Sequence, residues 1–167
     1  MTRRSTLVAV LLPLLLLAAG CGDDDDDDAA AAADTVDCHV TVDEASSAVG
    51  LPLEESQTAF PDDGVGETCS WEYTFEDATA TVDVTWFEGT GADAMEDAGA
   101  AYSDAEAVDV QGADEAVYSA ENSAVVARAG DDAVRVFVVG PDIILDDPKG
   151  AAITIAEVAF GLATEGE

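Results

Sequence analysis

Residues 69–86 decide the fold, and they read CSWEYTFEDATATVDVTW. Polar and apolar side chains alternate in the first half, so Cys69, Trp71, Tyr73 and Phe75 share one face of a strand. The second half repeats the pattern with Ala80, Val82, Val84 and Trp86. Because only residues 77–79 separate the two runs, the stretch predicts a β-hairpin with an aromatic core face.

The aromatic side chains of this hairpin allow two interpretations. Trp71, Tyr73, Phe75 and Trp86 could line a hydrophobic pocket for a lipid or a glycan. A strand face that also carries a cysteine is more typical of a buried core. We therefore expect these residues to belong to the core.

Helical signals lie on both sides of the hairpin. Thr41 and Glu44 form a capping box that begins a helix, and Gly50 ends it. Helical spacing returns from Ala92 to Tyr102. Asp147 followed by Pro148 predicts the start of a third helix, which should run to about Ala163.

A second hairpin signal follows the central helix. Two apolar runs, residues 124–129 and 133–139, flank Gly130-Asp131-Asp132, and residues 116–118 predict another short strand. Adjacent hairpins imply a mostly antiparallel sheet. The sequence therefore predicts a two-layer α+β fold, with a sheet of four or five strands and about three helices packed on one face.

The first twenty residues have the character of an export signal. Arg3 and Arg4 precede an apolar run from Leu7 to Ala19, which is shorter than the roughly twenty residues of a membrane span. The following residues, LAAGC at 17–21, resemble the lipobox of bacterial lipoproteins. This resemblance implies cleavage before Cys21, lipidation of that cysteine, and attachment to the outer side of the cell membrane.

An acidic segment separates Cys21 from the predicted domain. Residues 21–37 contain six consecutive aspartates, Asp23 to Asp28, and then a run of alanines. A calcium site is the alternative to a solvated tether, but the run lacks the ligand spacing and the glycine of a calcium loop. We expect a tether in residues 21–37 and a single globular domain in residues 38–167.

The two remaining cysteines predict a structural bond. In an exported chain, lipidation of Cys21 leaves Cys38 and Cys69 to form a disulfide. A free reactive pair or a metal site is the alternative, although neither a CxxC motif nor a zinc spacing is present. We therefore expect a disulfide, no metal and no cofactor.

The charge balance restricts the class of partner. The chain has 37 acidic and five basic side chains, and its formal net charge is −32. Nucleic-acid binding through phosphates needs clustered lysines and arginines, so we exclude it. The single histidine, His39, is expected to be an ordinary exposed side chain. Asp and Glu pairs suited to glycoside hydrolysis remain an alternative, because acids occur throughout the chain.

Two arginines are the candidate binding residues. Arg128 and Arg135 lie on opposite arms of the second predicted hairpin and should point away from its apolar face. Two neighbouring cations on an acidic surface could hold a carboxylate or a phosphate. The alternative is that nearby acids neutralise both in surface ion pairs.

The arrangement of motifs resembles a family of small actinobacterial lipoproteins of unknown function. The resemblance rests on the lipobox, on Cys38 before a short helix ending at Gly50, and on Cys69-Ser70-Trp71. Residues 110–116, VQGADEA, match its middle element loosely. The resemblance implies a cell-envelope lipoprotein with an α+β domain, and it carries over no catalytic residues.

These observations together predict a lipid-anchored, extracytoplasmic protein. Without a catalytic constellation, we expect a non-catalytic binding or accessory module that recognises a small molecule or an envelope protein. An envelope hydrolase using Asp and Glu pairs, or a structural, cation-binding surface protein, is the alternative.

Overall fold

The structure is a computed structural model that describes residues 39–62 and 66–161. These residues belong to a compact unit that spans Asp34–Glu167. The predicted signal peptide, Cys21, the acidic tether and Cys38 lie outside the described residues. The expectations for them therefore stay predictions.

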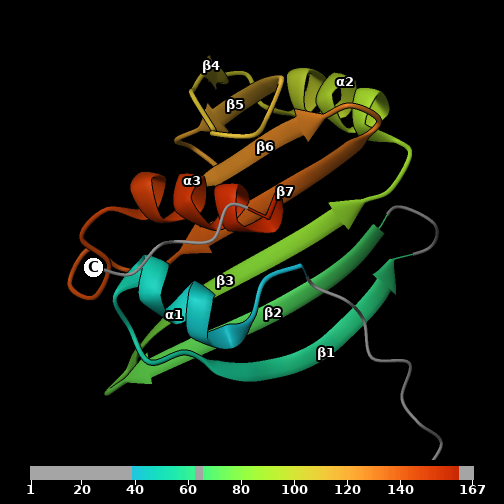
Figure 1. The fold of residues 1–167 in the computed structure, drawn as a ribbon. Coiled ribbons are helices and arrows are strands. Elements are labelled where there is room, and N and C mark those ends of the chain that lie inside the picture. Colours follow the sequence, from blue (N-terminus) through green and yellow to red (C-terminus); the bar gives the residue numbers. More distant parts are fainter. Residues whose placement is uncertain (1–38, 63–65, 162–167) are drawn as a thin grey trace, which may run out of the picture. The chain divides into compact units, whose positions relative to one another are not determined.

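One antiparallel sheet of seven strands and three helices make up the described fold (Figure 1). The elements in chain order are α1 (Val42–Val49), β1 (Glu54–Asp62), β2 (Gly66–Phe75), β3 (Ala78–Phe87), α2 (Gly91–Ala101), β4 (Glu106–Ala107), β5 (Glu115–Ser119), β6 (Ala124–Ala129), β7 (Asp132–Val139) and α3 (Pro148–Ala159). The strands lie in the order β1-β2-β3-β7-β6-β5-β4. The α+β class and the antiparallel sheet are confirmed.

Both predicted hairpins are present in the expected register. In the first, Cys69 pairs with Val84 and Trp71 with Val82. In the second, Ala129 pairs with Asp132 around a tight turn, where Gly130 has a φ of 62°. Such left-handed backbone favours glycine because a Cβ is strained there. The central sheet therefore follows directly from the alternation of its sequence.

The predicted number of strands was wrong: the sheet has seven strands, and the sequence predicted four or five. The sequence of β1, EESQTAFPD, does not alternate, and its pairing with β2 contains two register shifts. Strand β4 has only two residues, and both pair with β5. Each of these strands depends on hydrogen bonds to a neighbouring strand rather than on a local pattern of its own.

Helices α1 and α3 begin where their capping residues predict. The Thr41 side chain caps α1 together with Glu44, and Gly50 ends the helix with a φ of 72°. The Asp147 carboxylate accepts a hydrogen bond from the Gly150 backbone N–H, with Pro148 in the first turn of α3. Helix α3 ends at Ala159, before the predicted Ala163.

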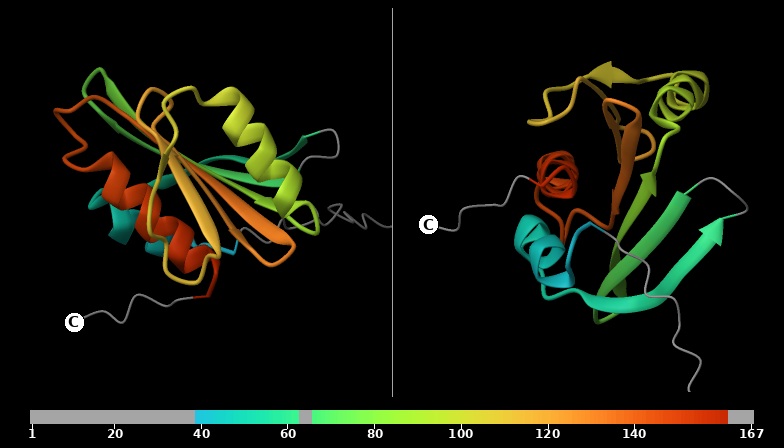
Figure 2. Two further views of the ribbon diagram at one scale, coloured as in Figure 1. Left: turned by 90° about the horizontal axis from the view of Figure 1, so that it is seen from above. Right: turned by 45° about the vertical axis from the view of Figure 1, so that its right-hand side comes forward.

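The helices do not all cover the same face of the sheet. Helices α1 and α3 pack on one face, whereas α2 lies across β6 and β7 on the other (Figure 2). The expectation of three helices on one face was therefore wrong. Continuous burial of Ala124 to Ala127 in β6 has the same cause, because both faces of that strand are covered.

The main core lies between the sheet and the helices α1 and α3. Val82, Val134 and Val136 are fully buried there and contact the same cluster as Ile155 of α3. Trp71 is buried in this core, and Tyr73 and Trp86 pack against it. Phe75 shares their strand face but lies at the hairpin end, where half of it is exposed. The core interpretation holds for the other three aromatics.

Candidate ligand-binding site

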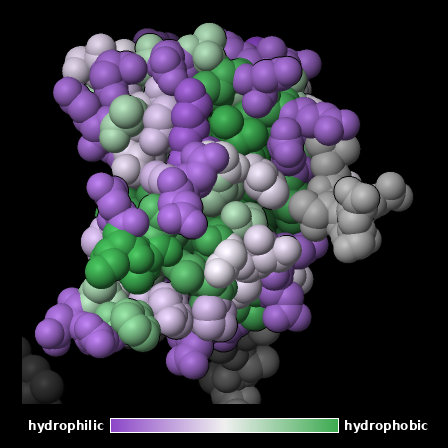
Figure 3. Space-filling model, turned by 90° about the vertical axis from the view of Figure 1, so that its left-hand side faces the viewer, coloured by the Kyte–Doolittle hydropathy of each residue, from purple (hydrophilic) through white to green (hydrophobic). Residues whose placement is uncertain are grey.

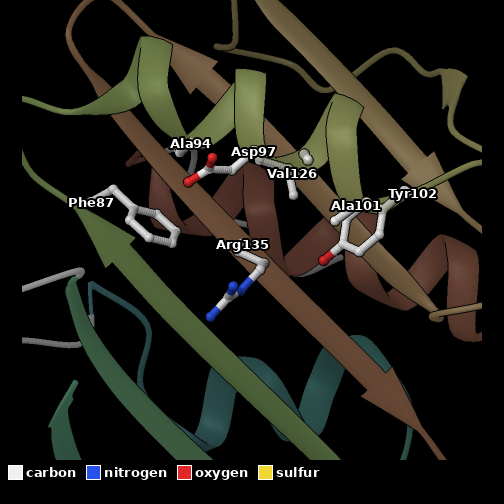
Figure 4. A pocket seen from close by; sticks show the side chains of 8 residues that line it. Phe87, Ala94, Asp97, Ala101, Tyr102, Val126 and Arg135 are labelled. Atoms are coloured by element: carbon white, nitrogen blue, oxygen red, sulfur yellow. The ribbon is translucent and has the colours of Figure 1, made fainter. Parts of the chain in front are cut away.

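A small cavity lies between α2 and the face of the sheet that α2 covers. Its volume is about 90 Å³. Pockets for drug-sized ligands usually measure about 300–1,000 Å³, so this one suits a much smaller molecule. The lining residues are Phe87, Ala94, Asp97, Ala98, Ala101, Tyr102, Val126 and Arg135 (Figure 4).

Arg135 supplies the positive charge of this cavity. It lies on β7 directly opposite Thr85 of β3 and Val126 of β6. Its guanidinium carbon is 5.4 Å from the centre of the Phe87 ring and 5.2 Å from that of Phe137. Cation–π contacts at these distances are attractive and fix the position of the charge. The sheet register therefore places the guanidinium between two aromatic rings.

The guanidinium keeps most of its hydrogen-bonding capacity unused. An arginine has five N–H donors. Arg135 makes one long hydrogen bond, from Nη2 to Thr85 Oγ1 at 3.4 Å, and its Nε is buried without a partner. Among the described residues, no carboxylate forms an ion pair with Arg135. Buried polar groups usually have partners, so such an exception calls for an explanation.

Tyr102 brings a hydroxyl group to the same cavity. Figure 4 shows its oxygen directed toward the side chain of Arg135. Burial raises the pKa of Tyr102 above its ordinary value of 10.0, and the positive charge of Arg135 opposes this rise. The phenol is therefore neutral at physiological pH and is able to donate a hydrogen bond to an anion.

Helix α2 is fixed over the sheet by its first residue. The backbone N–H of Gly91 donates to the Asp131 carbonyl oxygen at 2.7 Å, in the turn between β6 and β7. A Cβ at Gly91 would lie 2.7 Å from the Asp132 carbonyl oxygen. Nearby, the Asp132 carboxylate accepts from the Gly89 backbone N–H at 2.9 Å. The helix can approach this turn closely because residue 91 has no side chain.

The structure assigns different surroundings to the two predicted arginines. Both occupy the sheet face opposite the main core, as their strand positions predict. Arg128 forms an ion pair with Glu115 at 3.6 Å and donates to the Gly130 carbonyl oxygen. It does not line the cavity. Of the two arginines, only Arg135 lines the cavity. The binding of an anion by Arg135 stays a prediction.

The other residues singled out in the sequence are the two cysteines of the predicted disulfide and the single histidine. Cys69 is disulfide-bonded, and its predicted partner Cys38 lies outside the described residues. The exposed His39 stacks on Trp86, with ring centres 4.1 Å apart. His39 thus packs near the C-terminal end of β3. The hairpin turn after Phe75 lies at the other end of that strand.

Sequence reasoning missed the residues that surround Arg135. Phe87 and Phe137 lie outside the alternating core face, Asp97 belongs to α2, and Tyr102 directly follows that helix. The sequence contains one indication of this site: the unbroken apolar run from Ala124 to Ala127 is typical of a strand covered on both faces. That run implies an element packed on the second face but does not identify it.

The hydrolase alternative stays a prediction, because carboxylate pairs line two other cavities. Glu54 and Glu72, which pair across β1 and β2, line one of them. A second, more open cavity between α1 and the start of α3 contains Asp146 and Asp147. The Asp147 carboxylate is already used to cap α3. Within residues 39–62 and 66–161, no group of three His, Cys, Asp or Glu side chains could hold a metal ion. None of the described helices is long and apolar enough to cross a membrane.

Large apolar side chains are exposed near the opposite end of the sheet. Phe75 ends β2, Val139 ends β7, and Ile143 lies in the following loop with 81% of its surface exposed. Figure 3, which views the molecule from the left-hand side of Figure 1, shows hydrophobic areas among hydrophilic ones. None of these three side chains lines the cavity beneath α2.

Comparison with known proteins gives no further guide to function. No protein-family model, no curated protein and no solved structure matches the chain. The resemblance to actinobacterial lipoproteins therefore stays a prediction.

Proposed function

We propose that this protein is a lipid-anchored, extracytoplasmic binding module that holds a small carboxylate in the cavity beneath α2. Arg135 is the residue that would bind the carboxylate, and Tyr102 would donate a second hydrogen bond. Cys21 would carry the lipid that keeps the domain at the cell membrane.

The state of Arg135 is the observation that carries this proposal. In a chain with 37 acidic side chains, an arginine is expected to find a carboxylate partner. Arg128 and Lys149 do so, with Glu115 and Glu106. Arg135 instead lines a cavity and has no carboxylate partner among the described residues. Its Nη groups are suited to a carboxylate, which guanidinium groups bind through two parallel hydrogen bonds.

The test is a titration of the full chain in detergent with propionate, followed by calorimetry or by NMR. We expect Arg135→Met to weaken binding by roughly 10- to 150-fold, because hydrogen bonds to charged groups contribute about 1.5–3 kcal/mol. Arg128→Met is the matched control, since it removes the same charge from the same sheet face outside the cavity. Equal losses in the two variants, or no binding of propionate or of any other small carboxylate, would contradict the assignment.

The lipid anchor has a separate test. Metabolic labelling with a clickable fatty acid should mark the wild-type chain and leave Cys21→Ser unmarked, because acylation needs that thiol. Cell fractionation should then recover the wild-type protein with membranes. An unlabelled wild-type chain, or an intact precursor in the cytosol, would overturn this part of the proposal.

A further inference from the structure

The cavity beneath α2 holds a negative charge as well as a positive one. Asp97 projects from α2 and lines the same cavity as Arg135 (Figure 4). The two side chains form no ion pair with each other, and the Asp97 carboxylate has no hydrogen-bond or ion-pair partner among residues 39–62 and 66–161. Both charges therefore remain available to a ligand placed between them.

Opposite charges that do not neutralise each other favour a ligand with two opposite charges. A carboxylate alone would satisfy Arg135 but would approach the negative charge of Asp97. A ligand that also carries an ammonium group would satisfy both residues. Complementary charges of this kind give specificity, because a like charge placed against Asp97 is repelled.

The charge of the whole chain acts in the same direction. The formal net charge is −32, so the protein repels anions over distances up to the screening length of about 8–10 Å. A zwitterion has no net charge and does not meet this repulsion. The overall field therefore disfavours a simple carboxylate more than a zwitterion.

The walls of the cavity restrict the size of the ligand. Ala94, Ala98 and Ala101 face the cavity from positions that share one side of α2. Their methyl groups leave a space of only about 90 Å³, which Phe87 and Val126 also line. A short carbon skeleton fits this space and these apolar walls.

We infer that the ligand is a small zwitterion of the α-amino-acid class, with its carboxylate on Arg135 and its ammonium on Asp97. This inference rests on the proposed function and names its ligand class. Arg135 and Tyr102 would hold the carboxylate, Asp97 would select the ammonium group, and the three alanines would accept a side chain as small as a methyl group.

The test compares three probes on the full chain in detergent: L-alanine, propionate, which lacks the ammonium group, and ethylamine, which lacks the carboxylate. Asp97 is exposed, and an exposed ion pair contributes up to about 1 kcal/mol, so we expect L-alanine to bind up to about fivefold more tightly than propionate. Ethylamine should bind most weakly. Asp97→Asn should reduce L-alanine affinity to that of propionate. Glu96→Gln, which changes the neighbouring charge on α2 outside the cavity, should preserve the preference.

The outcomes separate this inference from the proposed function. If propionate binds through Arg135 as tightly as L-alanine does, the zwitterion inference is wrong and the carboxylate site stands. Equal effects of Asp97→Asn and Glu96→Gln would also overturn it, because the preference would then reflect only the general field. If none of the three probes binds, the proposed function itself fails.

Discussion

Arg135 gives the fold little net stability. Its contacts with Phe87 and Phe137 stabilise the fold by roughly 0.5–1 kcal/mol each. The buried Nε without a partner costs about 1–3 kcal/mol. The two contributions are similar in size and opposite in sign. Folding stability therefore does not account for this arginine, which supports the proposed carboxylate site.

Asp104 provides a residue-scale prediction about pH. Its carboxylate accepts from the Ser119 hydroxyl at 2.6 Å and from the Glu121 backbone N–H at 2.8 Å. The bond from Ser119 is the main reason why the pKa of Asp104 lies below its ordinary value of 3.8. Because the folded-state pKa is lowered, the stabilisation is full above about pH 3.8 and is lost as pH falls through the folded-state pKa.

We therefore expect Asp104→Asn to lower Tm at neutral pH, and the difference from wild type to shrink at acid pH. Thermal unfolding followed by circular dichroism across this range measures the effect. Asp109→Asn is the control, because the exposed Asp109 makes no hydrogen bond with the described part of the chain. A difference for Asp104→Asn that stays constant with pH would show that the carboxylate charge is not responsible.

At the scale of elements, the position of α2 determines whether the cavity exists. The helix covers part of β6 and β7 on the face that α1 and α3 leave open. Only its first residue, Gly91, meets backbone atoms so closely that a side chain is excluded. By contrast, Gly99 lies on the exposed side of the same helix, and a Cβ there would meet no heavy atom within 4 Å.

These two glycines give opposite predictions for the same substitution. Gly91→Ala should lower the free energy of unfolding by about 1–3 kcal/mol, because a Cβ would overlap the Asp132 carbonyl group. Gly99→Ala should raise it by about 0.5–1 kcal/mol, because alanine favours the helix. Urea unfolding at constant m-value measures both changes. Equal effects would mean that α2 is not seated on the β6–β7 turn.

At the scale of the whole molecule, repulsion between acidic side chains is the main electrostatic effect. The net charge is −32, and only two ion pairs are formed within the described residues. Salt screens repulsion between exposed charges, since the screening length falls from about 10 Å at 0.1 M to about 3 Å at 1 M. Stability should therefore rise with ionic strength.

We expect Tm to increase by at least about 4 °C between 0.05 M and 1 M sodium chloride, which corresponds to about 1 kcal/mol for a domain of this size. Differential scanning calorimetry measures this shift. Potassium chloride should have the same effect if screening is the cause. A Tm that falls or stays unchanged with salt would show that repulsion is not limiting.

The sequence by itself determined the parts of the fold that depend on neighbouring residues. Alternation in residues 69–86 predicts the first hairpin, and Gly130 marks the turn of the second. Capping residues Thr41 and Asp147 predict where α1 and α3 begin. These features are local, because each depends on side-chain period or on backbone hydrogen bonds within a few residues.

Only the tertiary structure decided which face α2 covers and which arginine meets the cavity. Helical spacing gives α2 an apolar side but does not choose between the two faces of a sheet. Arg128 and Arg135 have equivalent positions in the sequence pattern, yet one lies beside Glu115 and the other between Phe87 and Phe137. Strand pairing between residues far apart in the chain sets these neighbours, so local sequence could not specify them.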